Sequence, residues 1–435
     1  MITKRRIRRW LGFGGGFQRA ALLGFVGLAF LFFGSSLSLQ AIFLPIATRV
    51  QAFFDGILSL WFDGESLRNA RHYLAGVFLA SGLWLLFVSG KRFIGETLRF
   101  LNPSLEGPMM GHFVRRQRLF AGPAVVAIGG GTGLSTLLRG LKQHTTRITA
   151  VVTVTDDGGS SGRLASDTGI LPPGDIRNCL VALADAERTM TDLFQHRFEV
   201  ASGSLSGHSM GNLLIAAMVD ITGDFEKAVA EISKVLAIRG RVLPATLDRV
   251  TLKAEMEDGS ILYGETQIAS SPLQIRKLHL DPPDPKPLEE ALEAIRQADV
   301  IVIGPGSVFT SVIPPLLVPG IAEAIAESDA LKIYVCNVMT QPGESDKFTA
   351  SDHVHAIEAN VGRRVFDCVL VNKTRPSEQL LERYAKSGQD FVEPDVERIR
   401  AMGLRAITAN LISETDVVRH DPLRVADTIM RLVNA

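Results

Sequence analysis

Continuous apolar runs alternate with helical hydrophobic spacing in the second part of the chain. Ala124–Ile128 is entirely apolar and directly precedes glycines, a pattern typical of a buried parallel strand. Between Leu134 and Lys142, leucines recur three and four residues apart, which predicts a helix, and a β-branched run follows at Ile148–Val154. This strand–loop–helix–strand order within about 30 residues is the opening unit of a doubly wound sheet. We therefore predict an α/β fold with a Rossmann-like, doubly wound and mostly parallel sheet.

Later segments extend the same sheet, whereas the middle of the domain departs from it. Further buried strands are predicted at Asp299–Ile303, Lys332–Asn337 and Asp367–Asn372, and further helices at Ile321–Glu327, Ala350–Asn360 and Leu423–Val433. Before them, Ser209–Asp220 and Phe225–Ile238 have helical patterns. Arg249–Gly264 alternates like a strand on both sides of Glu257-Asp258-Gly259, which predicts a hairpin. An α+β insert over about residues 205–290 is therefore expected.

Two long uncharged runs stand near the N-terminus. Ala20–Pro45 and Tyr73–Gly90 contain no charged side chain, and about 20 apolar residues suffice to cross a hydrocarbon core. Basic residues lie outside both runs, namely Lys4, Arg5, Arg6, Arg8, Arg9 and Arg19 before the first and Lys91, Arg92, Arg99, Arg115, Arg116 and Arg118 after the second. This asymmetry predicts a two-helix transmembrane hairpin with both ends in the cytoplasm. A cleaved signal peptide and two buried helices of a soluble domain are the alternatives.

The resulting organisation has three parts. Residues 1–92 are expected to anchor the chain in the cytoplasmic membrane as a multi-pass segment. Residues 93–123 contain prolines, glycines and arginines and are typical of a polar linker. Residues 124–435 then form the Rossmann-like domain, which would lie in the cytoplasm.

Composition removes several classes of function. Lysine plus arginine and aspartate plus glutamate both number 46, so no overall basic field favours a nucleic-acid partner. The cysteines Cys179, Cys336 and Cys368 are far apart and form no C-x-x-C pair. Their spacing excludes a disulfide framework and a cysteine zinc site, and it is compatible with a reducing compartment.

The first predicted strand leads into a glycine-rich turn. Gly129–Gly133 reads Gly-Gly-Gly-Thr-Gly and stands between a strand and a helix, where backbone N–H groups and the helix dipole favour an anion. The turn is not a Walker sequence, because Lys142 comes much too late, and it is not a strict G-x-G-x-x-G. It predicts a nucleotide-type ligand that carries phosphate, although such turns also serve tight packing.

The second predicted strand delivers paired carboxylates to the same edge of the sheet. Asp156 and Asp157 are followed by Gly-Gly-Ser-Ser-Gly-Arg, ending at Arg163. The two carboxylates could hold a divalent cation such as Mg²⁺, accept sugar or ring hydroxyls, or act as a base. A solvated acidic loop is the structural alternative.

Three further loops add polar residues at strand ends and helix starts. Gly174–Asn178 sets Asp175 and Arg177 at a helix start, where Arg177 suits phosphate and Asp175 could simply cap the helix. Gly207–Asn212 contains His208, which is placed for proton transfer or merely packed in a loop. Gly304–Ser307 follows the strand predicted at Asp299–Ile303 and offers small residues and a hydroxyl for phosphate, and Asn337 closes the same edge after the next strand. The candidate ligand-binding residues are Gly129, Gly130, Gly131, Thr132, Gly133, Asp156, Asp157, Gly158, Gly159, Ser160, Ser161, Arg163, Gly174, Asp175, Arg177, Asn178, His208, Gly211, Asn212, Gly304, Pro305, Gly306, Ser307 and Asn337.

Taken together, these loops resemble the gluconeogenesis factor (YvcK) family, which is similar in fold to the 2-phospho-L-lactate transferase (CofD) family. The resemblance covers about residues 124–433 and excludes the predicted hairpin. It implies a Rossmann-like protein that binds UDP-sugars or similar dinucleotide-type ligands and acts in carbon use, cell shape and wall precursor supply. Self-association into a homo-oligomer is left open.

The resemblance also bears on catalysis. In the transferases an aspartate after the second strand binds the deazaflavin acceptor, and Asp157 is the position that best matches it. Here Gly158–Ser161 replaces the bulkier transferase segment, which speaks against deazaflavin chemistry. A regulatory nucleotide-sugar sensor is the first expectation. A phosphotransferase that uses Asp157 with a divalent cation and a NAD-dependent oxidoreductase are the rivals.

Overall fold

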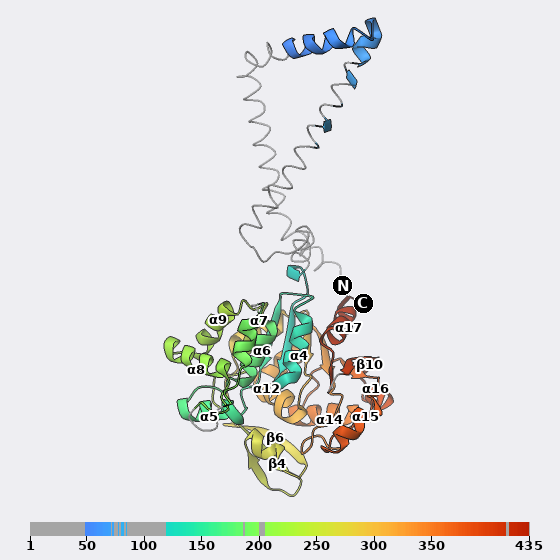
Figure 1. Cartoon of the computed structure of the whole chain (residues 1–435). Helices are drawn as coiled ribbons and strands as arrows, with labels where there is room; N and C mark the ends of the chain where they lie inside the picture. The colour runs from blue at the N-terminus through green and yellow to red at the C-terminus, as the bar shows by residue number, and fades with distance from the viewer. Residues whose placement is uncertain are drawn as a thin grey trace. The chain divides into compact units, whose positions relative to one another are not determined.

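The computed structural model describes residues 48–70, 72–73, 77, 80–81, 84, 119–185, 188–199, 205–414 and 417–434. The chain divides into two compact units, Met1–Met109 and Met110–Ala435, of which the second holds the α/β fold (Figure 1). In the first unit, residues 48–58 and 64–70 are helical.

The predicted hairpin falls mainly outside the described residues. The run Ala20–Pro45 lies wholly outside them, and of Tyr73–Gly90 only five residues are described. Within the described part of the chain, no single helix has both the length and the apolar character to cross a membrane. The transmembrane hairpin stays a prediction.

The second unit is built on a seven-stranded sheet in which every pairing is parallel. Its order is β10-β9-β8-β7-β1-β2-β3. The strands are β1 (Val125–Gly129), β2 (Ile148–Val152), β3 (Arg241–Pro244), β7 (Val300–Ile303), β8 (Leu331–Val335), β9 (Cys368–Asn372) and β10 (Arg405–Ala409). Numbered along the chain this is the order 3-2-1-4-5-6-7, the doubly wound arrangement of Rossmann folds extended by one strand. The α/β prediction is thus confirmed.

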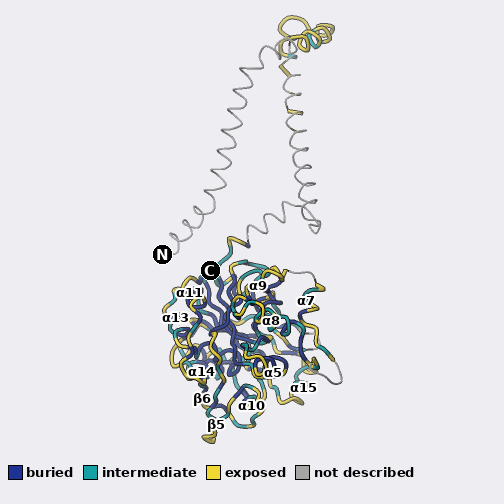
Figure 2. Tube along the Cα trace, turned by 90° about the vertical axis from the view of Figure 1, so that its left-hand side faces the viewer, coloured by how far each residue is buried: buried dark blue, intermediate teal, exposed yellow. Residues whose placement is uncertain are grey.

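Helices cover both faces of this sheet, as the labels in Figures 1 and 2 show. One face packs α4 (Gly131–Leu141), α6 (Gly174–Leu183), α9 (Phe225–Val235) and α17 (Pro422–Asn434). The other packs α11 (Glu289–Gln297), α12 (Ile313–Leu317), α13 (Ile321–Glu327), α14 (Ala350–Val361) and α16 (Val396–Ala401). Because both faces are buried, the strands are continuously apolar, which is why the sequence pattern reveals them.

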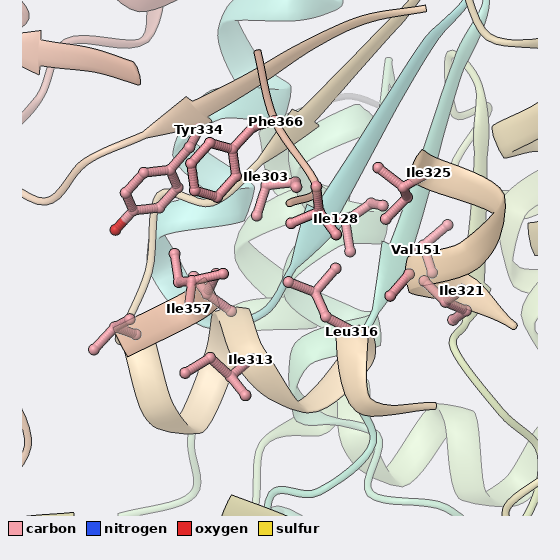
Figure 3. Packing of buried hydrophobic residues seen from close by; sticks show 14 of the residues in the cluster. Ile128, Val151, Ile303, Ile313, Leu316, Ile321, Ile325, Tyr334, Ile357 and Phe366 are labelled. Atoms are coloured by element: carbon pink, nitrogen blue, oxygen red, sulfur yellow. The ribbon is translucent and has the colours of Figure 1, made fainter. Parts of the chain in front are cut away.

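The core on the second face is tightly interdigitated. Ile128 and Ile303 point from neighbouring strands towards Leu316 of α12, and Tyr334 stacks on Phe366 with ring centroids 5.4 Å apart (Figure 3). Strands β1 and β7 are held side by side by this packing, which fixes the positions of the loops at their ends.

The antiparallel part of the predicted insert covers less of the chain than the expected range of residues 205–290. Its antiparallel part is a three-stranded sheet in the order β5-β4-β6, made of β4 (Thr251–Met256), β5 (Ile261–Tyr263) and β6 (Ile275–Asp281), with α10 (Glu265–Ala269) after β5. We call residues 251–281 the appendage. Strand β3, inside the expected range 205–290, instead pairs in parallel with β2. Short strands such as β3 carry too few residues for the pattern to assign them to a sheet.

The remaining elements lie around this framework. They are α5 (Gly159–Thr168), α7 (Arg188–Gln195), α8 (Met210–Thr222), the π-helical turn η1 (Val308–Val312), α15 (Glu378–Ala385), and the antiparallel pair β11 (Ile412–Glu414) and β12 (Val418–His420).

Candidate functional site

The carboxyl ends of β1 and β7 define the switch point of the sheet. After β1 the chain crosses on the face of α4 to reach β2, whereas after β7 it crosses on the opposite face through η1 and α12 to reach β8. Open α/β sheets bind ligands in the crevice that such a reversal leaves at the carboxyl edge. The glycine loops after β1 and β7 both lie at this position.

These two glycine loops touch each other. The Gly304 N–H donates to the Ile128 carbonyl oxygen over 2.9 Å. A Cβ placed on Gly133 would lie only 2.3 Å from the Pro305 carbonyl oxygen. Gly131 has φ +65°, in the left-handed region that favours glycine. Glycine is therefore required here by the backbone turn and by the close approach of the two loops.

The start of α4 lacks a capping side chain from its own helix. Its N-cap is Gly130, which has no side chain to accept from the first turn, and that turn contains no acidic residue. The first N–H groups of a helix lack intrahelical partners and carry partial positive charge. Here the Gly131 N–H is satisfied by the Asp175 carboxylate from α6.

A relay of side chains connects that carboxylate to a buried guanidinium. The Asn178 side chain hydrogen-bonds Asp175, and the Arg177 Nη2 donates to Asn178 Oδ1 over 2.8 Å. Asp175 does not cap its own helix, because the N-cap of α6 is Pro173 and no side-chain cap bond forms. Burial raises the pKa of Asp175 to about 6, against the lowering effect of the Gly131 N–H, and the charge of Asp156 adds to the rise.

Arg177 is the cation at the centre of the site. Its residue is only 7% exposed, its Nη1 donates to Ser209 Oγ, and its Nε is buried without a partner. Among the described residues, no carboxylate lies within ion-pair distance of Arg177. A buried guanidinium normally pairs with an anion, so this one is placed to receive an anion from a ligand.

The Gly207–Asn212 loop surrounds the same arginine with hydroxyls and an amide. Ser160 Oγ lies 3.0 Å from His208 Nδ1 and 3.1 Å from Asn212 Nδ2, and all three residues are buried. Burial lowers the pKa of His208, and repulsion by Arg163 lowers it further, so the imidazole is neutral near pH 7. Glycine at position 211 lets the Arg177 side chain pack against the start of α8, since a Cβ added there would lie only 2.7 Å from Arg177 Cδ.

Asp156 and Asp157 have different surroundings. Asp156 accepts from the Gly158 N–H over 2.9 Å and approaches the start of α6, where a Cβ on Gly174 would lie 3.0 Å from its Oδ2. Asp157 turns away to the appendage, where its Oδ1 accepts from the Thr266 N–H and hydroxyl over 2.9 and 2.7 Å. Asp156 is thus the carboxylate of this pair that lies near Asp175 and Arg177.

Two carboxylates that sequence reasoning did not single out complete the site. Burial raises the pKa of Glu265 to about 9, and Asp156, Asp175 and Glu344 raise it further by repulsion. Burial also raises the pKa of Glu344, which accepts from Ser307 Oγ and from Thr310 Oγ1. Glu265 belongs to the appendage and Glu344 to the segment after β8, so no local motif signals either.

The side chains present do not form a metal centre by themselves. Across the described ranges, no group of three or more His, Cys, Asp or Glu side chains has an arrangement that could hold a metal ion. The acidic residues at the edge are instead committed to backbone and hydroxyl donors, as for Asp157 with Thr266 and Glu344 with Ser307.

The loop Gly304–Ser307, after β7, is held in place by neighbouring side chains. Asn337 binds the Gly306 backbone twice, accepting from its N–H over 3.2 Å and donating to its carbonyl oxygen over 2.7 Å. Ser307 caps η1 through the Thr310 N–H and also bonds Glu344. Asn337 and Ser307 therefore shape the loop after β7.

Comparison with known proteins identifies the family. The family model described as 2-phospho-L-lactate transferase CofD matches residues 125–412. A gluconeogenesis factor from Halalkalibacterium halodurans is 53% identical over 307 residues, which make up 70% of this chain and 95% of that protein. The chain belongs to the gluconeogenesis factor (YvcK) family.

Further relatives agree with this family. The gluconeogenesis factor of Bacillus subtilis is 49% identical over 312 residues, which cover 72% of this chain and 98% of that protein. A crystal structure of a Bacillus halodurans protein has 52% identity and a TM-score of 0.70, over 71% of this chain and 99% of the other. The resemblance drawn from the five polar loops is therefore confirmed.

Most of the residues that suggested the YvcK family meet at one edge of the sheet. A series of contacts links the loops after β1, β2 and β7 and the starts of α6 and α8 there. Arg163 lies at the rim, where its Nη2 donates to the Ser206 carbonyl oxygen over 2.7 Å. Thr132 is exposed at the start of α4.

Proposed function

We propose that this gluconeogenesis factor family protein binds a UDP-sugar, or another nucleotide with a pyrophosphate group, at the carboxyl edge of its sheet. The observation that carries the proposal is Arg177, a buried guanidinium that no carboxylate pairs within the described residues. It lies beside three helix starts, those of α4, α6 and α8, whose dipoles favour an anion in the same place.

The site has separate regions for the two chemical halves of such a ligand. The α4 start and Arg177 suit the pyrophosphate, because a guanidinium and the first-turn N–H groups after Gly131, whose own N–H binds Asp175, can donate to phosphate oxygens. The Asp156 carboxylate and the neutral His208 suit hydroxyls of a ribose or sugar, which need acceptors rather than charge neutralisation.

The relatives support a regulatory role. The relatives described above are named gluconeogenesis factors. The resemblance drawn from the polar loops implies a part in carbon use and cell shape. We infer that ligand binding, rather than turnover, is the activity of the domain, and that the N-terminal residues 1–92 hold it at the cytoplasmic face of the membrane. Oligomerisation is not required by any of the geometry.

A phosphotransferase is the second candidate, favoured by the matching family model and by the acidic groups of the site. Asp175, whose pKa is raised to about 6, would take up a proton near neutral pH as a general base must. Because Asp157 is hydrogen-bonded to Thr266, Asp156 and Asp175 would be the carboxylates that act in phosphoryl transfer.

Titration calorimetry of the full chain in detergent, with a UDP-sugar, UMP and the free sugar, tests the proposal. We expect binding of the UDP-sugar and weaker binding of the other two, because each lacks part of the ligand. Absence of binding by all three would refute it. Product analysis of the same mixtures, with and without Mg²⁺, separates the candidates, since turnover would establish a transferase.

A further inference from the structure

The helix at residues 48–58 has a sharply divided surface. Val50, Phe53, Ile57 and Trp61 recur three and four residues apart, so they lie along one side of the helix. Trp61 lies in the turn that follows the helix. Its N–H donates to the Leu58 carbonyl oxygen over 3.0 Å, and this hydrogen bond keeps Trp61 close to the end of the helix.

This apolar stripe is exposed. Val50 is 50% exposed, Phe53 65%, Ile57 45% and Trp61 82%, and the segment is coloured yellow along most of its length in Figure 2. Large apolar side chains exposed as one continuous stripe mark a surface that meets an apolar partner.

The opposite side of the helix is polar, and the helix as a whole carries no net charge. Gln51, Asp55 and Ser59 follow one another at intervals of four residues. Between residues 48 and 61 the charged residues are Arg49 and Asp55, one of each sign. Attraction of this helix to an anionic surface is therefore weak, and its binding would depend on apolar burial.

The surrounding sequence indicates what covers the stripe. An uncharged run of 26 residues' length, Ala20–Pro45, ends just before the helix, and a second uncharged run begins at Tyr73. Trp61 and Phe62 stand at the end of the helix, and tryptophan is enriched where protein meets lipid headgroups. The segment also precedes residues 125–412, the part of the chain that the family model matches.

We propose that residues 48–61 form an interfacial helix that lies in the plane of a lipid bilayer. Val50, Phe53, Ile57 and Trp61 would enter the boundary between headgroups and acyl chains, and Gln51 and Ser59 would face water. Binding would occur on zwitterionic lipid and change little with salt, because the helix has no net charge. The proposal does not depend on the nucleotide site.

Single-tryptophan variants of the full chain provide the test. With Trp10→Phe and Trp84→Phe, Trp61 is the only tryptophan, and the chain is reconstituted in phosphatidylcholine vesicles. Bromines near the carboxyl end of the lipid acyl chain should quench Trp61 more strongly than bromines near the terminal methyl. The matched control adds Trp61→Phe and Ser59→Trp, which moves the probe to the polar stripe and should leave it open to aqueous acrylamide.

Three results would overturn the proposal. Equal lipid quenching of both probes would mean that the segment is immersed on all sides. Acrylamide quenching of both would leave the helix in water. Protection of Trp61 from lipid bromines and acrylamide alike would mean that protein, such as a second copy of the chain, covers the stripe. A further variant, Ile57→Asp, should increase acrylamide quenching of Trp61 if the stripe is in lipid.

Discussion

The carboxylate of Asp157 accepts two hydrogen bonds from one residue, Thr266, over 2.9 Å from its N–H and 2.7 Å from its hydroxyl. The two residues belong to separate parts of the fold, since Asp157 follows β2 and Thr266 lies in the appendage. This pair therefore joins the appendage to the rim of the ligand site. It also turns Asp157 away from Arg177 and leaves Asp156 facing the site.

We predict that Asp157→Ala loosens the appendage more than it weakens ligand binding. Loss of two hydrogen bonds at an exposed position should lower the free energy of unfolding by on the order of 1–2 kcal/mol. Amide hydrogen exchange should accelerate in residues 155–163 and 264–269 together, because the pair holds both segments. Exchange measured by mass spectrometry on the full chain checks this.

Asp258→Ala is the matched control. Asp258 also accepts from the N–H and hydroxyl of one residue, Ser260, but both residues lie in the same hairpin turn. This variant should accelerate exchange near the turn alone. If Asp157→Ala abolished UDP-sugar binding while exchange stayed unchanged, Asp157 would be a ligand residue rather than a link to the appendage.

Gly133→Ala should separate the two glycine loops. The added Cβ would meet the Pro305 carbonyl oxygen at 2.3 Å, and a backbone atom cannot move aside as a flexible side chain could. Overpacking of this kind costs about 1–3 kcal/mol, more than the helix propensity that alanine adds. Urea unfolding should show this loss, and calorimetry should show loss of nucleotide binding.

Gly362→Ala is the matched control for Gly133→Ala, because it strains the backbone without bringing the new Cβ against another atom. Gly362 ends α14 with φ +75° and has no atom within 4 Å of a built Cβ. Its substitution should cost about 1 kcal/mol through the left-handed backbone alone and leave nucleotide binding intact. Retention of both stability and binding in Gly133→Ala would contradict the contact between the loops.

The sequence predicts the parallel sheet well because burial on both faces makes its strands continuously apolar. The predicted run Ile148–Val154 contains β2, and Ile321–Glu327 coincides with α13. Strands β3 and β10 escape prediction. β3 has only four residues, and no residue of β10 is fully buried, so neither produces a long apolar run.

The site is predictable as a set of loops, but its internal contacts are not. Glycines and polar residues after strands reveal the edge of the sheet, because the carboxyl ends of parallel strands meet there. Which carboxylate faces inward depends on a partner more than a hundred residues away, as with Asp157 and Thr266. Glu265 enters the site from the appendage for the same reason, and no local pattern could place it.

Glu265 should make stability fall as pH rises. Burial and neighbouring carboxylates raise its pKa from 4.5 to about 9, so the folded state holds a proton that the unfolded state releases. Its stabilising contribution is complete below the unfolded pKa and is lost as pH rises through about 9. Glu265→Gln should therefore match the parent below about pH 4 and exceed it, by roughly several kcal/mol, at about pH 9. Urea midpoints across this range check the difference.

Glu255→Gln is a control of opposite sign. The hydrogen bond from Arg276 lowers the pKa of Glu255, so its contribution is present above the unfolded pKa and is lost as pH falls. This variant should be less stable than the parent near neutral pH and converge with it in acid. A Glu265→Gln profile parallel to that of the parent would mean that Glu265 is ionised in the folded protein.

Arg177→Met tests the residue on which the proposed function rests. Methionine keeps an unbranched apolar side chain of similar length but removes the guanidinium, whose charge no carboxylate pairs within the described residues. Replacing a buried ionic group by an apolar one is often neutral for stability, so the urea midpoint should change little. Hydrogen bonds from a charged donor contribute about 1.5–3 kcal/mol, so UDP-sugar affinity should fall about 10- to 100-fold. Arg239→Met removes a cation that pairs with Asp185 away from the site and should leave affinity unchanged. Equal affinity of the Arg177→Met variant and the parent, measured by calorimetry, would show that the anion binds elsewhere.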